Sequence, residues 1–355
     1  MIQNSTSLCN KSHLSNIISW LRFPLIFFII MLHCYSVTRL EGNHESYFKI
    51  LYPFSLWIGE TGVPGFFFIS GLLFFLSSKT YNQKIKTRLN TLLVPYFLWN
   101  GAMLLVYFIA FLVGFPQEIN HHNIANYTLF DYLRLFWDRG SYDNGNFVPL
   151  LCPLWYIRNL FLMALISPLL YFIIRYTREL FLITIAVWWF ATFHNAFVPQ
   201  TILFFSLGAY FSIFAINPMK FFSKYKNLLL ILFVIFGLGD IIVHTIMEND
   251  YNLQIHRISL MLNIPVLFLL ASFFVRKNLT SQTLSNASFV VFCIHYPIVI
   301  IMRKFCVTFF LDASDSIHIL LYFASVILST IMSLSFYQIL KKFFPKTSRI
   351  LSGNR

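Results

Sequence analysis

Long apolar runs separated by short polar segments dominate this chain. Several runs rich in Phe, Leu and Ile exceed 18 residues, which is long enough for a helix to cross a bilayer. We therefore expect an all-α membrane protein with about ten transmembrane helices. The expected spans are about 17–36, 51–77, 91–114, 150–174, 180–197, 201–216, 227–247, 257–275, 287–302 and 317–340.

Two features qualify this count. The fifth and sixth spans are short and are joined by a tight turn from Asn195 to Pro199, so a re-entrant pair is the alternative interpretation. The first run is longer than the apolar part of a cleavable signal peptide and no small-residue cleavage site follows it, so we expect it to remain as a membrane helix.

No internal repeat or low-complexity linker divides the chain. The one sizeable piece between the spans is the segment 115–149, which is polar and Asn-rich with Phe and Trp interspersed. We therefore expect a single transmembrane domain over residues 1–355, with its spans between about 17 and 340.

Charge predicts the orientation of the spans. Of the 26 Lys and Arg residues, eighteen lie in one alternating set of intervening segments, which includes both termini, and seven lie in the other set. Ten of the 13 acidic residues lie in that second set. The excess of basic residues on the cytoplasmic side of membrane proteins then predicts that both termini are cytoplasmic. Membrane orientation explains the net charge of +13, so we expect no nucleic-acid partner.

Composition adds little further chemistry. Hydrophobic residues make up 58% of the chain and charged residues only 11%, as a membrane protein requires. The five cysteines are scattered and none forms a Cys-x-x-Cys pair, so neither a metal site nor a disulfide framework is expected.

The first span carries two polar groups, Arg22 and His33. Eleven residues apart, they lie about 16 Å apart along one helix and on nearly the same face. Charged groups inside a membrane usually face the interior of the helix bundle, which makes this face a candidate site. The alternative is that Arg22 is an interfacial anchor and His33 only ends the helix.

The second span carries Glu60 within a Gly- and Pro-rich stretch, residues 59–75. Gly62, Pro64, Gly65 and Gly71 permit a local break and close approach of backbones, and broken membrane helices often line cavities. Glu60 is a candidate for orienting His33, and the alternative is that it faces external water. Ser70, next to Gly71, is interpreted as a helix-packing residue in preference to a nucleophile, because small residues commonly lie between packed membrane helices.

Later spans carry further polar groups. Arg88 lies just before the third span, in a basic segment that either binds a phosphorylated donor or only sets the topology. Arg158 lies about two turns inside the fourth span, where it needs a partner or a wet cavity, and Trp155 near it suits the membrane interface.

The last polar groups lie on the seventh and ninth spans. Asp240 and His244 are four residues apart, and we expect them to pair with each other. His295 precedes Pro297 and is expected either to satisfy a carbonyl that the proline frees or to line a pocket.

Together these residues resemble the acyltransferase-3 family of integral membrane acyltransferases, which includes O-antigen and exopolysaccharide O-acetylases. Arg22 and His33 are similar to its Arg, ten residues, His signature. Four further motifs follow in order: Val63-Pro64-Gly65-Phe66-Phe67-Phe68-Ile69-Ser70-Gly71, Arg88 with Pro95-Tyr96-Phe97-Leu98-Trp99, Leu154-Trp155-Tyr156, and Ser288 through Pro297. In the last motif Phe292 replaces the usual tyrosine.

The resemblance implies a multi-pass O-acyltransferase of the cell inner membrane. It moves an acyl group, commonly acetyl, from acyl-CoA to a hydroxyl of a cell-surface saccharide or its lipid-linked precursor, with membrane lipids around it. His33 is then the central catalytic residue, as a general base or a transient acyl carrier, with Glu60 as its orienter. Arg22, Arg88 and Arg158 are assigned to the donor, and Ser70, Trp155 and His295 to the pocket. No metal and no permanently bound cofactor is expected.

The rival interpretation is a transporter or flippase of a lipid-linked saccharide. Charged spans interrupted by Gly and Pro are compatible with it, but the inverted repeats typical of transporters are absent from the sequence. Another acceptor, such as a peptide, a sterol or an antibiotic, is equally compatible with the motifs.

Overall fold

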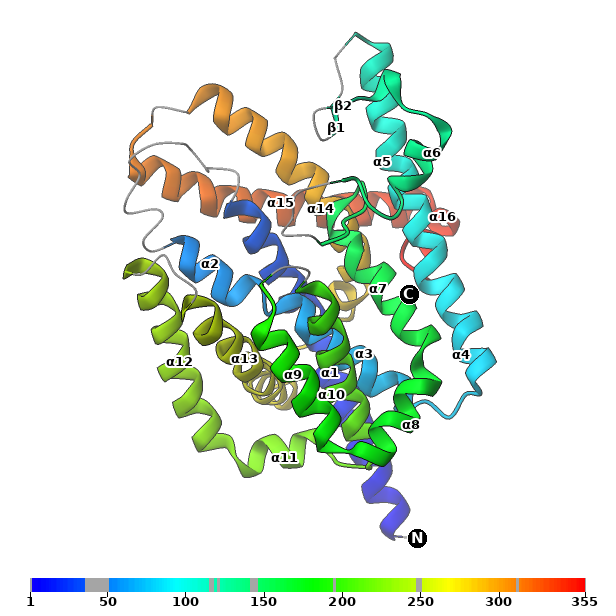
Figure 1. The fold of residues 1–355 in the computed structure, drawn as a ribbon, viewed down its shortest axis with the longest axis vertical. Coiled ribbons are helices and arrows are strands. Elements are labelled where there is room, and N and C mark those ends of the chain that lie inside the picture. Colours follow the sequence, from blue (N-terminus) through cyan, green and yellow to red (C-terminus); the bar gives the residue numbers. More distant parts are fainter. Residues whose placement is uncertain are drawn as a thin grey trace. The chain divides into compact units, whose positions relative to one another are not determined.

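The computed structural model describes residues 2–35, 51–114, 118–119, 122–140, 146–193, 196–246, 251–310 and 313–354. These residues are helical apart from their connections and one pair of two-residue strands (Figure 1). By contact the chain divides into two compact units: Met1–Ile69 with Phe214–Tyr337, and Ser70–Ile213 with Gln338–Arg355.

The first unit contains α1 (Ile2–Cys34), α2 (Tyr52–Gly59), the first half of α3 (Gly62–Leu76), α11 (Pro218–Lys224), α12 (Lys226–Ile246), α13 (Tyr251–Arg276), α14 (Gln282–Phe309) and most of α15 (Asp315–Phe343). The second contains the rest of α3, α4 (Tyr81–Arg88), the π-helical turn η3 (Leu89–Leu93), α5 (Val94–Leu112), β1 (Glu118–Ile119), β2 (His122–Asn123), η4 (Ile124–Asn126), α6 (Leu129–Arg134), η5 (Cys152–Leu154), α7 (Trp155–Leu165), α8 (Ser167–Thr177), α9 (Glu179–Ala191), α10 (Phe197–Ile213) and α16 (Pro345–Leu351).

The apolar helices make this a multi-pass membrane protein. Within the described ranges, seven helices are long and apolar enough to cross a membrane, and up to nine spans result if each of two bent pairs counts as one. The bent pairs are Cys152–Leu165 with Ser167–Thr177, and Phe197–Ile213 with Pro218–Lys224. The expected count of ten is therefore not confirmed. The expected fifth span is the 13-residue helix α9, about 20 Å long against about 30 Å of hydrocarbon.

In the first unit α1 packs against α2, α13 and α14. Its buried positions include Leu21, Leu25 and Ile29, which recur every four residues and so form one stripe. A break at residues 60–61 separates α2 from α3, as the Gly- and Pro-rich stretch predicts. A Cβ at Gly59 would lie 2.6 Å from the Cβ of Leu32, and one at Gly62 would lie 2.6 Å from the carbonyl oxygen of Leu25.

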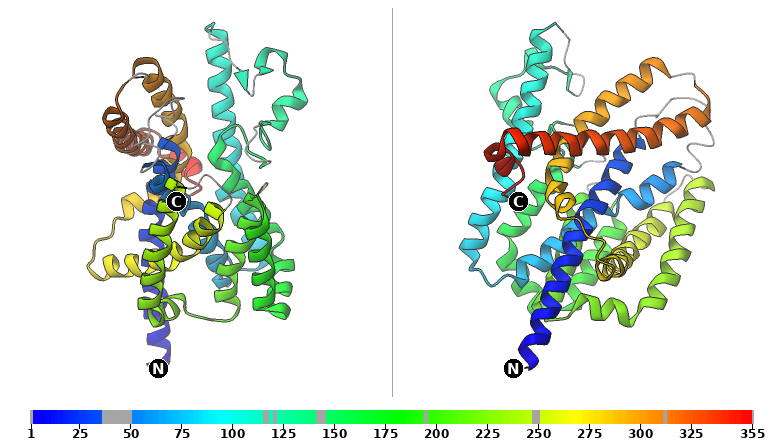
Figure 2. Two further views of the ribbon diagram at one scale, coloured as in Figure 1. Left: turned by 60° about the vertical axis from the view of Figure 1, so that its left-hand side comes forward. Right: turned by 180° about the vertical axis from the view of Figure 1, so that it is seen from behind.

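In the second unit α10 packs against α7, α8 and α9, and α9 and α10 lie side by side (Figures 1 and 2). The Trp189 ring meets Phe204 edge-on at 5.2 Å between ring centroids. A Cβ at Gly71 would lie only 2.0 Å from the carbonyl oxygen of Phe205, so α3 and α10 touch through their backbones. Small residues at helix interfaces permit this approach.

The segment after α5 forms a small structure of its own. Ile119, Ile124, Leu135 and Leu150 are buried together, with tyrosines from the same segment and from α5 packed around them. The hydroxyl of Tyr127 donates to the carbonyl of Ile119. The predicted polar loop therefore encloses a compact apolar cluster in the part that the structure describes.

Candidate active site

The last turn of α1 brings His33 against α14. The imidazole rings of His33 and His295 lie 5.4 Å apart between centroids, and the ring of Tyr296 meets His33 edge-on at 5.0 Å. His295 is fully buried, and its Nδ1 lies 3.2 Å from the carbonyl oxygen of Val291. A carbonyl can only accept, so Nδ1 carries the hydrogen and Nε2 is left with its lone pair. Nε2 of His295 has no hydrogen-bond partner among the described residues.

The contact at His295 differs from one of the two sequence expectations. A proline at position 297 frees the carbonyl four residues earlier, at Cys293. The imidazole instead contacts the carbonyl of Val291, one turn before its own position. His295 therefore does not serve the proline, and its place beside His33 favours the pocket interpretation.

Arg22 and His33 share one helix face, as predicted. α1 is continuous from Ile2 to Cys34 despite Pro24, so their spacing of eleven residues sets them about 20° apart around the axis. Ile26 and Ile29 lie on the same face between them, and each is only 2% exposed. This face is therefore directed into the first unit, which argues against a lipid-facing anchor for the whole stretch.

Two hydroxyl groups hold the turn that carries His33. The Ser55 hydroxyl of α2 donates to the carbonyl oxygen of Met31 at 2.9 Å. It also lies 2.8 Å from the hydroxyl of Tyr322 on α15, and both side chains are fully buried. These bonds link the last turn of α1 to two neighbouring helices and so restrict the position of the His33 backbone.

Replacing Tyr322 by phenylalanine should test this support. The change removes the hydroxyl that contacts Ser55 at 2.8 Å and the Met31 carbonyl oxygen at 3.5 Å, which costs about 1 kcal/mol, and leaves the ring in place. We expect a several-fold fall in kcat with little change in KM, because the turn under His33 loosens while substrate contacts stay. Thr330→Val on the same helix is the control, since Thr330 donates only to Val326 of its own helix. Equal kinetic losses in both variants would contradict a specific role for Tyr322.

Glu60 does not pair with His33 as expected. Its Oε2 instead lies 3.1 Å from Nε2 of His256 on α13, and Nδ1 of the same imidazole lies 2.7 Å from Oδ2 of Asp240. The reason is geometric: Glu60 sits at the break after α2, which contacts α12 and α13. The expected partner of Asp240 was His244, whose side chain lies outside the described residues.

Ser70 and Trp155 lie in helix contacts of the second unit. Ser70 precedes Gly71, whose backbone contact with α10 accords with the packing interpretation of this pair. The indole of Trp155 stacks on the ring of Phe197 at 3.8 Å between centroids, with 10° between the ring planes. Trp155 is 7% exposed, so it is packed against α10 and is not an exposed anchor at the membrane interface.

Arg88 ends α4 directly before the π-helical turn η3. Pro95 follows two residues after this turn, and a helical proline clashes with the carbonyl four residues before it, which a wider turn can relieve. Arg88 and Lys84, one turn apart, both lie over the ring of Phe74, with the cations 6.0 and 5.0 Å from its centroid. Two cations thus lie against one aromatic ring, and two neighbouring cations suit an anionic ligand.

Arg158 binds backbone carbonyls of the segment before α7. Its Nη1 donates to the carbonyl of Trp137, its Nη2 donates to that of Phe147 at 2.9 Å, and the guanidinium lies over the Trp137 ring at 4.5 Å. Nε and Nη2 also donate to Oδ1 of Asn159. Most of its donors are therefore engaged within the protein. This geometry favours a structural role over the donor contact that the sequence suggested.

Replacing Arg158 by lysine should loosen this segment without weakening donor binding. A lysine ammonium cannot reproduce a planar fork of donors, so the partly buried carbonyls of Trp137 and Phe147 lose partners, at a cost of about 1 kcal/mol each. We expect faster chymotrypsin cleavage near Trp137 and unchanged CoA affinity, measured on the purified protein. Arg134→Ala is the control, because its ion pair with Asp138 is exposed on the arginine side and contributes about 0–1 kcal/mol. About tenfold weaker CoA binding by a folded Arg158→Lys protein would return Arg158 to the donor site.

A groove of about 440 Å³ opens beside the middle of α1. Its volume is within the range of small-molecule sites. It lies between α1 and the connection from α13 to α14, and its lining is apolar with several hydroxyl groups: Ser19, Trp20, Phe23, Pro24, Asn278, Leu279, Thr280, Ser281, Leu284 and Ser285.

Comparison with known proteins bears on this arrangement. The acyltransferase-3 family, whose model describes an acyltransferase domain, matches residues 16–338. The chain is also 24% identical over 322 residues to the succinoglycan biosynthesis protein ExoH of Rhizobium meliloti (strain 1021), covering 84% of this chain and 82% of ExoH. No solved structure matches the chain.

The fold and these matches define a class first: the protein is a helical, multi-pass membrane protein of the acyltransferase kind. More particularly, the chain belongs to the acyltransferase-3 family.

Proposed function

We propose that this protein transfers an acyl group, most simply acetyl, from acyl-CoA to a hydroxyl of a cell-surface saccharide or its lipid-linked precursor in the inner membrane. The observation that carries the proposal is His33 on α1, held beside His295 and Tyr296 inside the first unit. Membership of an acyltransferase family supports the reaction class. The match to a protein of succinoglycan biosynthesis supports a saccharide acceptor.

Two routes use His33. As a general base, its imidazole takes the hydroxyl proton while the oxygen attacks the thioester carbon, and the proton then passes to the CoA thiolate when the C–S bond breaks. As an acyl carrier, its nitrogen attacks the thioester, CoA leaves, and the acyl group passes from the imidazole to the acceptor oxygen. Both routes require a neutral imidazole, which a histidine readily supplies near pH 7.

The donor is the second part of the proposal. Acyl-CoA carries an apolar acyl-pantetheine arm and several phosphates. The groove beside Trp20 and Phe23 offers apolar surface and hydroxyl groups for such an arm, and Arg22 follows on the same helix. A separate candidate, considered within the second unit alone, is the pair Arg88 and Lys84, whose two cations suit phosphate oxygens.

The test is acyl transfer by the purified wild-type protein in lipid nanodiscs. Radiolabelled acetyl-CoA is offered with a pool of cell-surface polysaccharide and lipid-linked sugar, and label in the saccharide fraction is counted. We expect label to move only when protein and saccharide are both present. If no label moves, while the protein carries a lipid-linked sugar across vesicles, it is a transporter and the proposal is wrong.

A further inference from the structure

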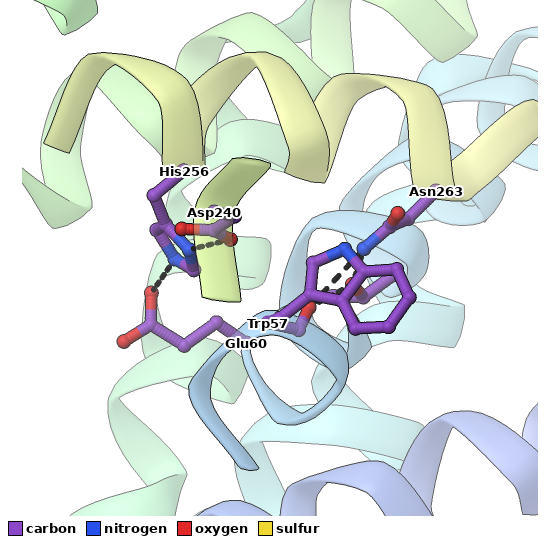
Figure 3. A network of polar contacts seen from close by, with 6 residues as sticks. Trp57, Glu60, Asp240, His256 and Asn263 are labelled. Atoms are coloured by element: carbon purple, nitrogen blue, oxygen red, sulfur yellow. Dashed lines mark hydrogen bonds and ion pairs between the residues drawn. The ribbon is translucent and has the colours of Figure 1, made fainter. Parts of the chain in front are cut away.

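Three ionisable side chains of the first unit, separate from His33, form a hydrogen-bonded chain (Figure 3). His256 on α13 lies between Asp240 on α12, with Nδ1 to Oδ2 at 2.7 Å, and Glu60 at the break before α3, with Nε2 to Oε2 at 3.1 Å. The side chains of Asp240 and His256 are 1% and 7% exposed, whereas that of Glu60 is 39% exposed. The chain thus runs from a buried carboxylate to an accessible one.

This arrangement can move one proton. Carboxylate oxygens face both ring nitrogens of His256, so both nitrogens carry hydrogen when the two carboxylates are ionised. The proton between Nε2 and Oε2 can shift to Glu60 with little movement of heavy atoms, while Asp240 holds Nδ1–H and orients the ring. The same logic operates wherever a carboxylate orients a histidine for acid–base work.

Helix packing alone does not explain why three ionisable side chains are hydrogen-bonded to one another at this position. Asn263 already links α13 to the break between α2 and α3. Its Nδ2 donates to the carbonyl oxygen of Trp57 at 3.1 Å and to the Thr61 hydroxyl at 2.7 Å. Buried ionised groups are costly, and apolar residues of similar size hold helices together as well or better. Ionisable groups in the helices of a membrane protein are therefore candidates for function.

Charge at the accessible end is balanced. Arg257 adjoins His256, is 3% exposed, and interacts electrostatically with Glu60. Two carboxylates, one imidazolium and one guanidinium sum to zero, so Glu60 can hold its charge in this setting. Oε1 of Glu60 makes no hydrogen bond within the described ranges, which leaves it available for a ligand.

The contact between α2 and α13 at Trp57 and Asn263, here called the junction, also offers polar atoms for a hydroxyl group. Nε1 of Trp57 and Oδ1 of Asn263 are both buried without a hydrogen-bond partner in the described part of the chain, and Asn263 is 4% exposed. One is a donor and the other an acceptor, and a hydroxyl group can serve both. Figure 3 shows the two side chains side by side, next to the break that carries Glu60.

Transfer of the acyl group to the acceptor needs a second base, which takes the proton of the acceptor hydroxyl. If His33 carries the acyl group, its nitrogen is occupied and cannot take the proton of the acceptor. His295 is fully buried and its Nδ1 is engaged by the carbonyl of Val291, whereas the side chain of Glu60 is 39% exposed. Glu60 directly follows Gly59, which packs so closely on Leu32, the residue before His33, that an added Cβ would lie 2.6 Å from the Cβ of Leu32.

We propose that Glu60 is a second catalytic residue, which binds the hydroxyl of a polyhydroxylated acceptor and takes its proton, with His256 and Asp240 as its positioning residues. The inference rests on the proposed function and on its acyl-carrier route. The acceptor oxygen forms a bond to the acyl carbon, the bond from that carbon to the imidazole nitrogen breaks, and its electron pair returns to the nitrogen. The hydroxyl proton goes to Oε1 of Glu60 and from there to solvent.

The test separates the two halves of the reaction in nanodiscs. The donor half is measured as a burst of CoA from acetyl-CoA without acceptor, and the second half as label reaching the saccharide pool. In Glu60→Gln we expect the burst to remain and transfer to fall by at least about 100-fold, the loss typical of a missing general base. His256→Gln and Asp240→Asn should lower kcat for transfer and leave the KM for acetyl-CoA unchanged.

Thr61→Val is the matched control, because it removes the neutral hydrogen bonds of the Thr61 hydroxyl with Trp57 and Asn263, keeps the shape of the side chain and spares the three ionisable groups. A folded Thr61→Val protein should keep transfer within about threefold of wild type. If it loses as much as His256→Gln, or if Glu60→Gln transfers normally or loses the burst as well, the inference is overturned. Absence of a burst from the wild type overturns the acyl-carrier route and this inference, while label transfer by that wild type still supports the proposed function.

Discussion

Acyl transfer is expected to fall by about 10²–10⁴-fold when His33 is replaced by alanine, because both routes pass through its imidazole. The ring is held at the end of α1, within 5.4 Å of His295 and 5.0 Å of Tyr296 between centroids. The loss should appear in kcat, with acetyl-CoA affinity within about threefold of wild type, because the donor contacts proposed above lie elsewhere. Transfer of radiolabel and equilibrium binding of CoA measure the two quantities.

His13→Ala is the matched control for this experiment. His13 lies on the same helix, and its Nε2 lies 3.2 Å from the hydroxyl of Ser272, two turns or more before Arg22. Loss of that contact should cost about 1 kcal/mol of stability and leave kcat near the wild-type value. If a folded His33→Ala protein transfers label as well as His13→Ala, His33 is not the catalytic residue, even though the family assignment stands.

Gly71→Ala should be the most damaging substitution for folding. The new Cβ would lie 2.0 Å from the carbonyl oxygen of Phe205 and 2.9 Å from its carbon, both backbone atoms that cannot rotate away. α3 and α10 would have to separate, and overpacking of this kind costs about 3 kcal/mol or more. Thermal unfolding in detergent and the monodisperse yield on size-exclusion chromatography measure the loss.

Gly101 offers the matched control, since a Cβ there meets no atom within 4 Å. Gly101→Ala on α5 should be neutral or stabilise the protein by up to about 1 kcal/mol, because alanine is the better helix former. Similar unfolding temperatures for the two variants would contradict the close packing of α3 on α10.

Local pattern was sufficient for much of the fold and for part of the site. The helices follow from apolar runs, because a backbone in lipid must satisfy its own hydrogen bonds and does so as helix. The shared face of Arg22 and His33 follows from the helical period alone. The break near Glu60 and the close approaches at Gly62 and Gly71 follow from residues without a bulky side chain.

Other expectations failed where partners come from distant parts of the chain. His256 went unnoticed, although it lies only 16 residues after Asp240. A weak signal was present, because two consecutive spans each carry an ionisable residue, and such residues in membranes tend to pair. Helical spacing predicts that Asp240 pairs with His244 on the same helix, but it cannot predict which residue of the neighbouring helix comes close. Arg158 likewise resembles a ligand-binding cation until its carbonyl partners at Trp137 and Phe147 are seen.

By itself, then, the sequence determined the class of this protein: its apolar runs make it a helical membrane protein, and its ordered motifs resemble the acyltransferase-3 family to which it belongs. Those properties depend on composition and on periods of a few residues. Only the tertiary structure decided that His33 lies against His295, that Arg158 holds a loop, and that Glu60 pairs with His256. The physical reason is that hydrogen bonds and ring contacts act over a few ångströms in space, and helix packing alone determines which distant residues come that close.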